Sequence, residues 1–308
     1  MIIDEIQYAP ALFTQIKIYV DQKKENSSFW LSGSQQFSLM KNLSESLSGR
    51  VAILKLLGFS SGEIAKKEFK RKKPWSPLNH TIPKLTSPKL EDLSSKIFHG
   101  GFPKLYSKGA RVREDVYFSS YVQTYLERDV RDLTHVGDLR DFERFVRACA
   151  ARTAQILNIT ELARDIGIAP NTAKKWLSIL EASFQVYLLE PYYKNITKRM
   201  IKSPKLYFLD TGLLAYLTGW KSPETLMSGA MSGAVFETFI VSEILKSWWG
   251  RGVEPPIWFW RTKEKEEVDL IFDIDGVLYP MEIKLTAMPS SAHVSSIQKF
   301  MSLTAEKK

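Results

Sequence analysis

The sequence is poor in the side chains that build disulfides and zinc sites. Cys149 is the only cysteine among 308 residues, which excludes an internal disulfide and a cysteine-based zinc site. A single cysteine is also what we expect of a chain that works in the reducing cytoplasm. The histidines are scattered without the spacing of metal ligands, so we expect surface or structural roles for His80, His99, His135 and His293.

Long apolar runs are absent as well. No run approaches the roughly 20 residues needed to cross a bilayer, and Asp4 and Glu5 interrupt the first apolar stretch, unlike a signal peptide. We therefore expect a cytoplasmic chain with no membrane partner. The net charge of +9 permits a polyanionic partner but says nothing about the fold.

Four stretches of different pattern predict an α/β fold. Residues 1–62 alternate short apolar runs with helical patterns, with buried strands expected at 2–3, 29–34 and 51–57 and a helix at 41–48. Residues 63–135 form an irregular connecting region that becomes helical at about 117–133. Residues 136–215 look helical, and residues 228–308 run helix, three strands, helix.

Two carboxylates close the first apolar run. Asp4 is placed to position a metal ion, and Glu5 to orient a water for attack on a phosphate. Ser34 lies just past the next strand, where the ATPases that these segments resemble place a polar residue that senses the γ-phosphate. Arg50 lies just before the third, where the same ATPases place an arginine finger for a neighbouring subunit's nucleotide, which implies a homo-oligomer.

These segments resemble the back half of the domain in a family of prokaryotic AAA-type ATPases. The resemblance rests on IIDEIQYAP, LSGSQQFSLM, SESLSGRVAIL and GFSSGEI. It implies an ATP-binding domain, partial here over residues 1–62, followed by a winged helix and a restriction-endonuclease-like segment. It also implies ATP and Mg²⁺ as cofactors of full-length relatives.

The phosphate-binding loop of such ATPases is missing from this sequence. G-x-x-x-x-G-K-[ST] occurs nowhere among the 308 residues, and without it Asp4 and Glu5 have no cradled phosphate to act on. We read the chain as truncated before the acidic strand and expect no ATP hydrolysis from it alone.

A winged-helix pattern occupies residues 136–215. Asn158 and Glu161 predict a helix start, Gly167 a turn, and residues 171–182 a second helix that buries Trp176. Lys174 and Lys175 lie off the buried face, where such a helix can enter the major groove of DNA.

A basic stretch follows, with tyrosines and no acidic residue between residues 191 and 207. We predict that its cations contact phosphates: Lys194, Lys198, Arg199, Lys202 and Lys205. The segments PYY and KRMIKSPKLYFLDTGL also match the ATPase family. The alternative is that the winged helix mediates protein contacts and that the charges are merely solvated.

A predicted hairpin near the end gathers carboxylates. Asp275-Gly276 is a two-residue turn signal, and the register that it sets places Asp269 opposite Glu282, and Glu267 opposite Lys284. The alternating apolar residues, Val268 and Leu270 among them, would share the other face.

Opposed carboxylates predict a divalent cation, Mg²⁺ or Mn²⁺. The segment resembles PD-(D/E)xK nucleases, in which Asp269, Glu282 and Lys284 would be catalytic and Asp269 and Glu282 would bind the metal. Glu237, on a helix expected at residues 233–248, matches the helical glutamate of the Holliday-junction-resolving branch, and this resemblance implies that it also binds the metal. We expect this nuclease-like domain, residues 228–308, to be incomplete.

The sequence thus predicts a DNA-associated protein of the AAA-type ATPase family. Two alternatives stay open. One is a metal-dependent nuclease supported by the N-terminal part, and the other is a DNA- or protein-binding module without catalysis.

Overall fold

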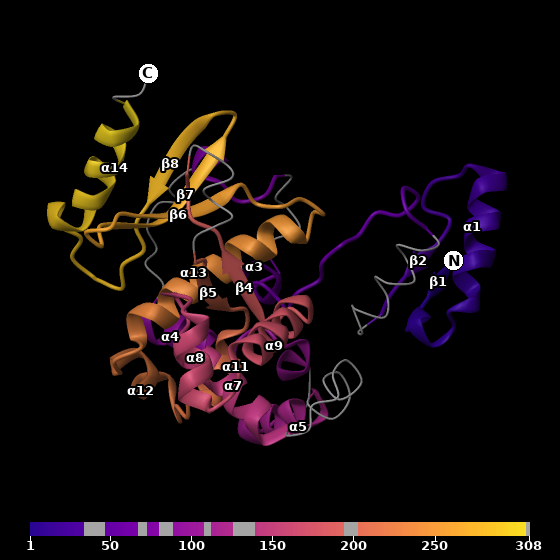
Figure 1. Ribbon diagram of the computed structural model, residues 1–308, viewed down its shortest axis with the longest axis horizontal. Coiled ribbons are helices and arrows are strands. Elements are labelled where there is room, and N and C mark those ends of the chain that lie inside the picture. Colours follow the sequence, from indigo (N-terminus) through magenta and orange to yellow (C-terminus); the bar gives the residue numbers. More distant parts are fainter. Residues whose placement is uncertain are drawn as a thin grey trace.

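The computed structural model describes residues 1–33, 47–66, 73–79, 89–107, 112–125, 139–193 and 203–305. Helices and small sheets mix in an α/β arrangement of three parts (Figure 1). The predicted sites Ser34, Lys194, Lys198, Arg199 and Lys202 lie outside the described residues. No helix among the described residues is both long and apolar enough to cross a membrane.

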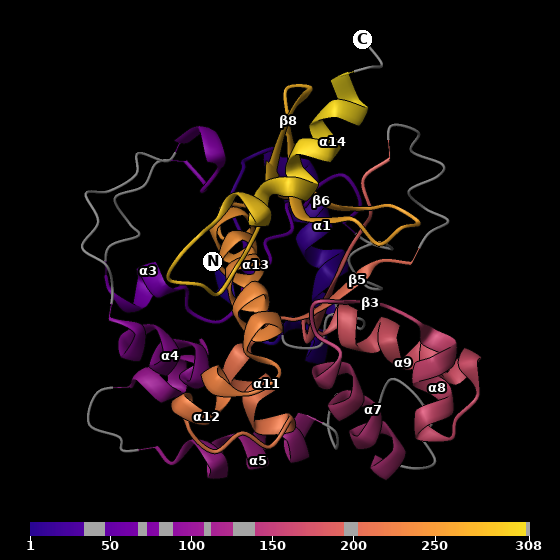
Figure 2. The ribbon, with the colours of Figure 1, turned by 90° about the vertical axis from the view of Figure 1, so that its left-hand side faces the viewer.

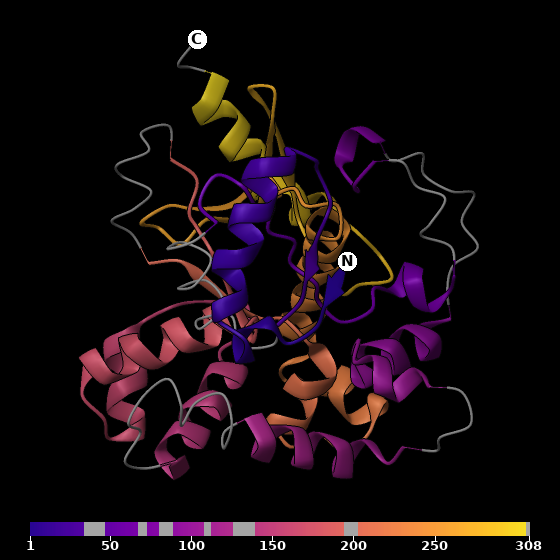
Figure 3. The same cartoon turned by 90° about the vertical axis from the view of Figure 1, so that its right-hand side faces the viewer.

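The N-terminal part is set apart from the other two in Figure 1 and lies in front of them in Figure 3. Strands β1 (Ile2–Ile3) and β2 (Trp30–Leu31) pair in parallel, and α1 (Ala11–Lys23) connects them. The expectation that these strands are buried is wrong, because Ile2 and Trp30 are exposed. Ile6, Phe13, Ile16 and Leu47 form its small core.

The prediction of a third strand in this part is wrong. Residues 51–57 form no strand, and they lead out of the small sheet toward α3 (Ser61–Ile64). An apolar run forms a strand only where a neighbouring strand can pair with its backbone N–H and C=O groups. Leu54 and Leu56 are exposed instead.

The helical part follows α3. Its elements are α4 (Leu90–His99), α5 (Glu114–Tyr125), α7 (Leu139–Ala151), β3 (Gln155–Ile156), α8 (Ile159–Ile166), α9 (Pro170–Ala182), β4 (Val186–Leu189), β5 (Lys205–Phe208), α11 (Thr211–Leu217) and α12 (Pro223–Ser228). Strands β3, β5 and β4 form an antiparallel sheet in that order. The rings of Phe142 and Phe145 pack edge-on against Trp176, which confirms Trp176 as a core residue.

The C-terminal part is a three-stranded antiparallel sheet between two helices. Its elements are α13 (Ser232–Trp249), β6 (Ile257–Arg261), β7 (Glu267–Ile274), β8 (Val277–Met281) and α14 (Ser295–Ala305). Leu270 and Phe272 pack on the α13 side, while Val268 and Ile271 pack with Phe300 of α14. Helix α13 runs from this sheet down to the helical part (Figure 2).

The predicted hairpin register is confirmed from Ile274–Val277 to Leu270–Met281. Asp275 and Gly276 both have positive φ, as a type I′ turn requires. Beyond Met281 the strand pairing stops, so Glu267 does not pair with Lys284.

A β-bulge corrects the expected faces of β7. Between Trp258 and Trp260, β6 advances two residues while β7 advances three, from Ile271 to Val268. The extra residue turns the strand, which is why Val268 and Leu270 face opposite sides. Bulges re-aim side chains, and this one lies at Asp269.

Asp210 joins α4 to α11. Its carboxylate accepts hydrogen bonds from the Leu213 amide, at 2.9 Å, and from the Gly101 amide, at 2.8 Å. The backbones approach so closely that a Cβ on Gly212 would lie 2.4 Å from the His99 carbonyl oxygen.

We expect Gly212→Ala to lower the free energy of unfolding by about 1–3 kcal/mol, because the added methyl meets backbone that cannot move aside. Gly233→Ala is the control, since a Cβ at that helical position meets nothing within 4 Å, and we expect it to stabilise by up to about 1 kcal/mol. Thermal unfolding of both variants, followed by circular dichroism, checks this. Equal effects would contradict the close approach.

Candidate functional site

Side chains from β5, α13, β6, β7 and the segment that follows β8 converge where β5, α13 and the C-terminal sheet meet. We call this the lysine–carboxylate cluster, and it comprises Lys205, Tyr207, Glu237, Arg261, Glu267, Asp269, Glu282 and Lys284. The structure thus brings together Glu237, Asp269, Glu282 and Lys284, which the sequence analysis assigned to one nuclease-like site.

Lys205 lies at the centre, with a side chain only 3% exposed. Its Nζ is 2.7 Å from Glu237 Oε1, 2.6 Å from Glu267 Oε1 and 3.8 Å from Asp269 Oδ1. Burial lowers the pKa of Lys205, but Glu237 and Glu267 outweigh burial and raise it above its ordinary value. Lys205 is therefore a charged residue of the interior.

This burial corrects the prediction that Lys205 contacts DNA phosphates. Strand β5 is buried along its whole length, and Lys205 shares one strand face with Tyr207. Tyr207 Oη donates a 2.6 Å hydrogen bond to the same Glu237 oxygen that Lys205 contacts. The sequence signal for the burial of Lys205 was its i, i+2 spacing from Tyr207 in an apolar strand. The basic residues before this strand obscured that signal.

The second half of the cluster is built on Asp269. Its Oδ2 accepts hydrogen bonds from the Ile283 amide, at 2.8 Å, and from Lys284 Nζ, at 3.0 Å. Lys284 Nζ also lies 2.7 Å from Glu282 Oε2. Asp269 and Glu282 therefore lie together as the register predicted, although they are joined by a side-chain hydrogen bond and through Lys284, and not by strand pairing.

The two neighbouring acids differ in their affinity for protons. Burial tends to raise the pKa of Asp269, but the Ile283 amide and the nearby lysines outweigh it, so the pKa is lowered. Burial, and then Asp269 itself, raise the pKa of Glu282 to about 7 against the effect of Lys284. Near neutral pH Asp269 is therefore ionised, whereas Glu282 is only partly ionised.

The predicted divalent cation does not fit this donor set. Glu237 and Glu267 are bound to Lys205, Asp269 and Glu282 to Lys284, and Glu267 also to Arg261, at 2.8 Å. Four carboxylates thus meet three fixed cations, which leaves little charge to attract a metal. Across the described chain, no group of three or more His, Cys, Asp or Glu side chains is arranged to hold a metal ion.

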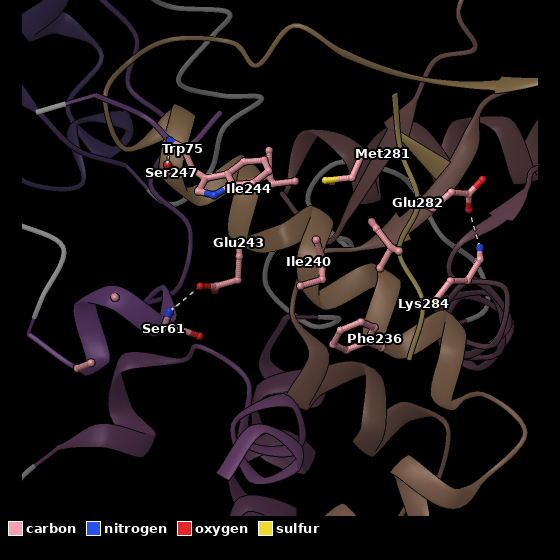
Figure 4. A pocket seen from close by; sticks show the side chains of 13 residues that line it. Ser61, Trp75, Phe236, Ile240, Glu243, Ile244, Ser247, Met281, Glu282 and Lys284 are labelled. Atoms are coloured by element: carbon pink, nitrogen blue, oxygen red, sulfur yellow. Dashed lines mark hydrogen bonds and ion pairs between the residues drawn. The ribbon is translucent and has the colours of Figure 1, made fainter. Parts of the chain in front are cut away.

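A cleft of about 620 Å³ opens beside the cluster (Figure 4). Phe236 and Ile240 of α13, with Met281 and Trp75, supply apolar walls, and Glu282 and Lys284 lie at one end. At the other end Glu243 accepts a 2.8 Å hydrogen bond from the Ser61 amide at the start of α3.

Asp4, Glu5 and Arg50 belong to the N-terminal part, whose β1, β2 and α1 lie away from the C-terminal sheet in Figure 1. Asp4 Oδ1 accepts a hydrogen bond from the Ser32 hydroxyl, and Glu5 Oε2 one from the Gln7 amide. Arg50 forms a two-pronged ion pair with Asp21 of α1, with Nε 2.5 Å from Oδ1. Arg50 thus has an acidic partner within its own chain.

The predicted helix pair of the helical part forms with its caps. The Asn158 side chain accepts a hydrogen bond from the Glu161 amide at the start of α8, and Gly167 turns the chain with φ +83°. Lys174 and Lys175 are exposed on α9.

Comparison with known proteins divides the chain in three. Residues 1–65 match the AAA domain model, residues 90–224 a domain of unknown function, DUF8612, and residues 232–308 another, DUF4143. The matches support an AAA-type ATPase-like family.

Two curated relatives are similar along most of the chain. They are the uncharacterized protein Mb2031c of Mycobacterium bovis and the uncharacterized protein Rv2008c of Mycobacterium tuberculosis. Each is 31% identical over 291 residues, which cover 94% of this chain but 59% of the relative. No solved structure matches the chain.

The raised pKa of Glu282 predicts a pH dependence of stability. Between its ordinary pKa of 4.5 and its folded value of about 7, the unfolded chain has released this proton and the folded chain has not. Its contribution to stability is therefore fully present below about pH 4.5 and is lost as the pH rises to about 7.

We expect Glu282→Gln to flatten this part of the profile, because glutamine cannot titrate. Melting temperatures measured from pH 4.5 to 7 check it, with Asp273→Asn as a control that removes an acid of the same sheet from outside the cluster. A wild-type slope in Glu282→Gln would show that Glu282 does not carry the dependence.

Proposed function

We propose that this AAA-type ATPase-like protein associates with DNA through a winged helix formed by α7, β3, α8, α9, β4 and β5. The order helix, short strand, two helices, two strands supports this assignment. In this arrangement α8 crosses the backbone and α9 enters the major groove.

The solvent face of α9 is the observation that carries the proposal. Asn171, Lys174, Lys175 and Ser178 are exposed there, while Ala173, Trp176, Leu177 and Leu180 are buried. The exposed set offers two cations and two hydrogen-bonding side chains, with no carboxylate before Glu181. Lysine contacts to phosphates would position the helix, and Asn171 could meet base edges.

ATP would act in this protein through Asp4 and Glu5, with a metal ion at Asp4. These 308 residues contain no phosphate-binding loop, so we propose that they do not hydrolyse ATP alone. We propose further that Arg50 serves a neighbouring subunit after release from Asp21. Assembly into an oligomer would let Arg50 exchange Asp21 for the neighbouring subunit's nucleotide.

The double variant Lys174→Glu/Lys175→Glu tests the DNA proposal. Fluorescence anisotropy with labelled duplex DNA at several salt concentrations should show affinity at least about tenfold weaker, and a log–log salt slope smaller by about 2. Lys221→Glu, on the exposed connection between α11 and α12, is the control for charge reversal at an exposed lysine outside α9. Unchanged affinity in the double variant would contradict the proposal.

The alternative is a metal-dependent nuclease, which the convergence of Glu237, Asp269, Glu282 and Lys284 favours. The lysine ion pairs oppose it, so we rank DNA association first.

Incubation of the chain with linear and branched DNA and Mn²⁺ separates the two functions. DNA association predicts mobility shifts without cutting, because the carboxylates are already bound to lysines. Cutting that is abolished in Glu282→Ala would establish the nuclease instead.

A further inference from the structure

The ammonium group of Lys205 lies where the carboxylates of the cluster converge. It contacts Glu237 of α13 and Glu267 of β7 within 2.7 Å and faces Asp269 at 3.8 Å. Glu237 belongs to α13, whereas Glu267 and Asp269 belong to β7. The lysine comes from a third element, β5. The bulge in β7 aims Asp269 toward this point.

We propose that Lys205 Nζ takes the place of a divalent cation in this cluster. The wild-type chain then binds neither Mg²⁺ nor Mn²⁺ there, and removal of the ammonium group converts the cluster into a cation site. This inference goes beyond DNA association and does not depend on it, because α9 contributes no residue to the cluster.

The neighbours of Lys205 fix both the ammonium and its carboxylates. Tyr207 Oη is hydrogen-bonded to Glu237, and Arg261 Nη1 lies 2.8 Å from Glu267 Oε2. A metal ion would have to displace a side chain that is 3% exposed and would lie against its positive charge. At such separations like charges repel strongly in a partly buried site.

Loss of the ammonium reverses this balance. Glu237, with a side chain 13% exposed, would then be a buried acid without its lysine, whereas Asp269, 6% exposed, would keep only Lys284. An uncompensated buried charge is strongly destabilising. Oxygen ligands from several acids are the donors that hard divalent cations prefer, so a metal would restore the lost stability.

The experiment compares the full wild-type chain with Lys205→Met and Lys246→Met. Lys246 is the matched control, because its side chain is also buried, at 9% exposed, but is paired with one carboxylate among the described residues, that of Glu243. Melting temperatures are measured in chelator and in Mn²⁺, and Mn²⁺ binding is measured by calorimetry and by the electron paramagnetic resonance of the free ion.

We expect both variants to melt below the wild type in chelator. Mn²⁺ should raise the melting temperature of Lys205→Met alone and should bind it at least about tenfold more tightly than the wild type. Adding Asp269→Asn to Lys205→Met should abolish the recovery.

Two results would overturn the proposal. One is stoichiometric Mn²⁺ binding by the wild type that Asp269→Asn removes, which requires no folded Lys205 variant. The other is a folded Lys205→Met that neither binds Mn²⁺ nor is stabilised by it.

Discussion

The buried ion pairs of Lys205 are the constraint on which the C-terminal half depends. One ammonium group connects β5 of the helical part to α13 and β7. Burying a charge is costly unless it is paired and hydrogen-bonded. The positions of these three elements are therefore coupled, because displacing any of them would leave a buried charge without its partner.

The same pairs decide how the nuclease-like layout is interpreted. Glu237, Asp269, Glu282 and Lys284 come together much as a metal-dependent nuclease would need. A layout is not a function, however, and function has to be argued from the charges of the site. Here lysines already pair with the acids, which argues against cleavage, and the DNA-associated role of α9 is our proposal.

Local sequence signals predicted the turns and caps of the fold. The Asp275-Gly276 turn determined the hairpin register, and Asn158 and Gly167 marked the ends of α8. Long-range effects were missed. Residues 51–57 look like a strand but have no partner, the bulge at Asp269 reverses the faces of β7, and Lys205 belongs to a basic stretch yet is buried. Each depends on residues distant in sequence, which local periodicity does not encode.

The most direct test of the account is a crystal structure of the wild-type chain grown with Mn²⁺, with diffraction recorded at the manganese absorption edge. The account predicts no anomalous peak among Glu237, Glu267 and Asp269, and Lys205 Nζ within hydrogen-bond distance of Glu237 and Glu267. A manganese peak bound by Glu237, Glu267 and Asp269, with Lys205 displaced, would contradict it.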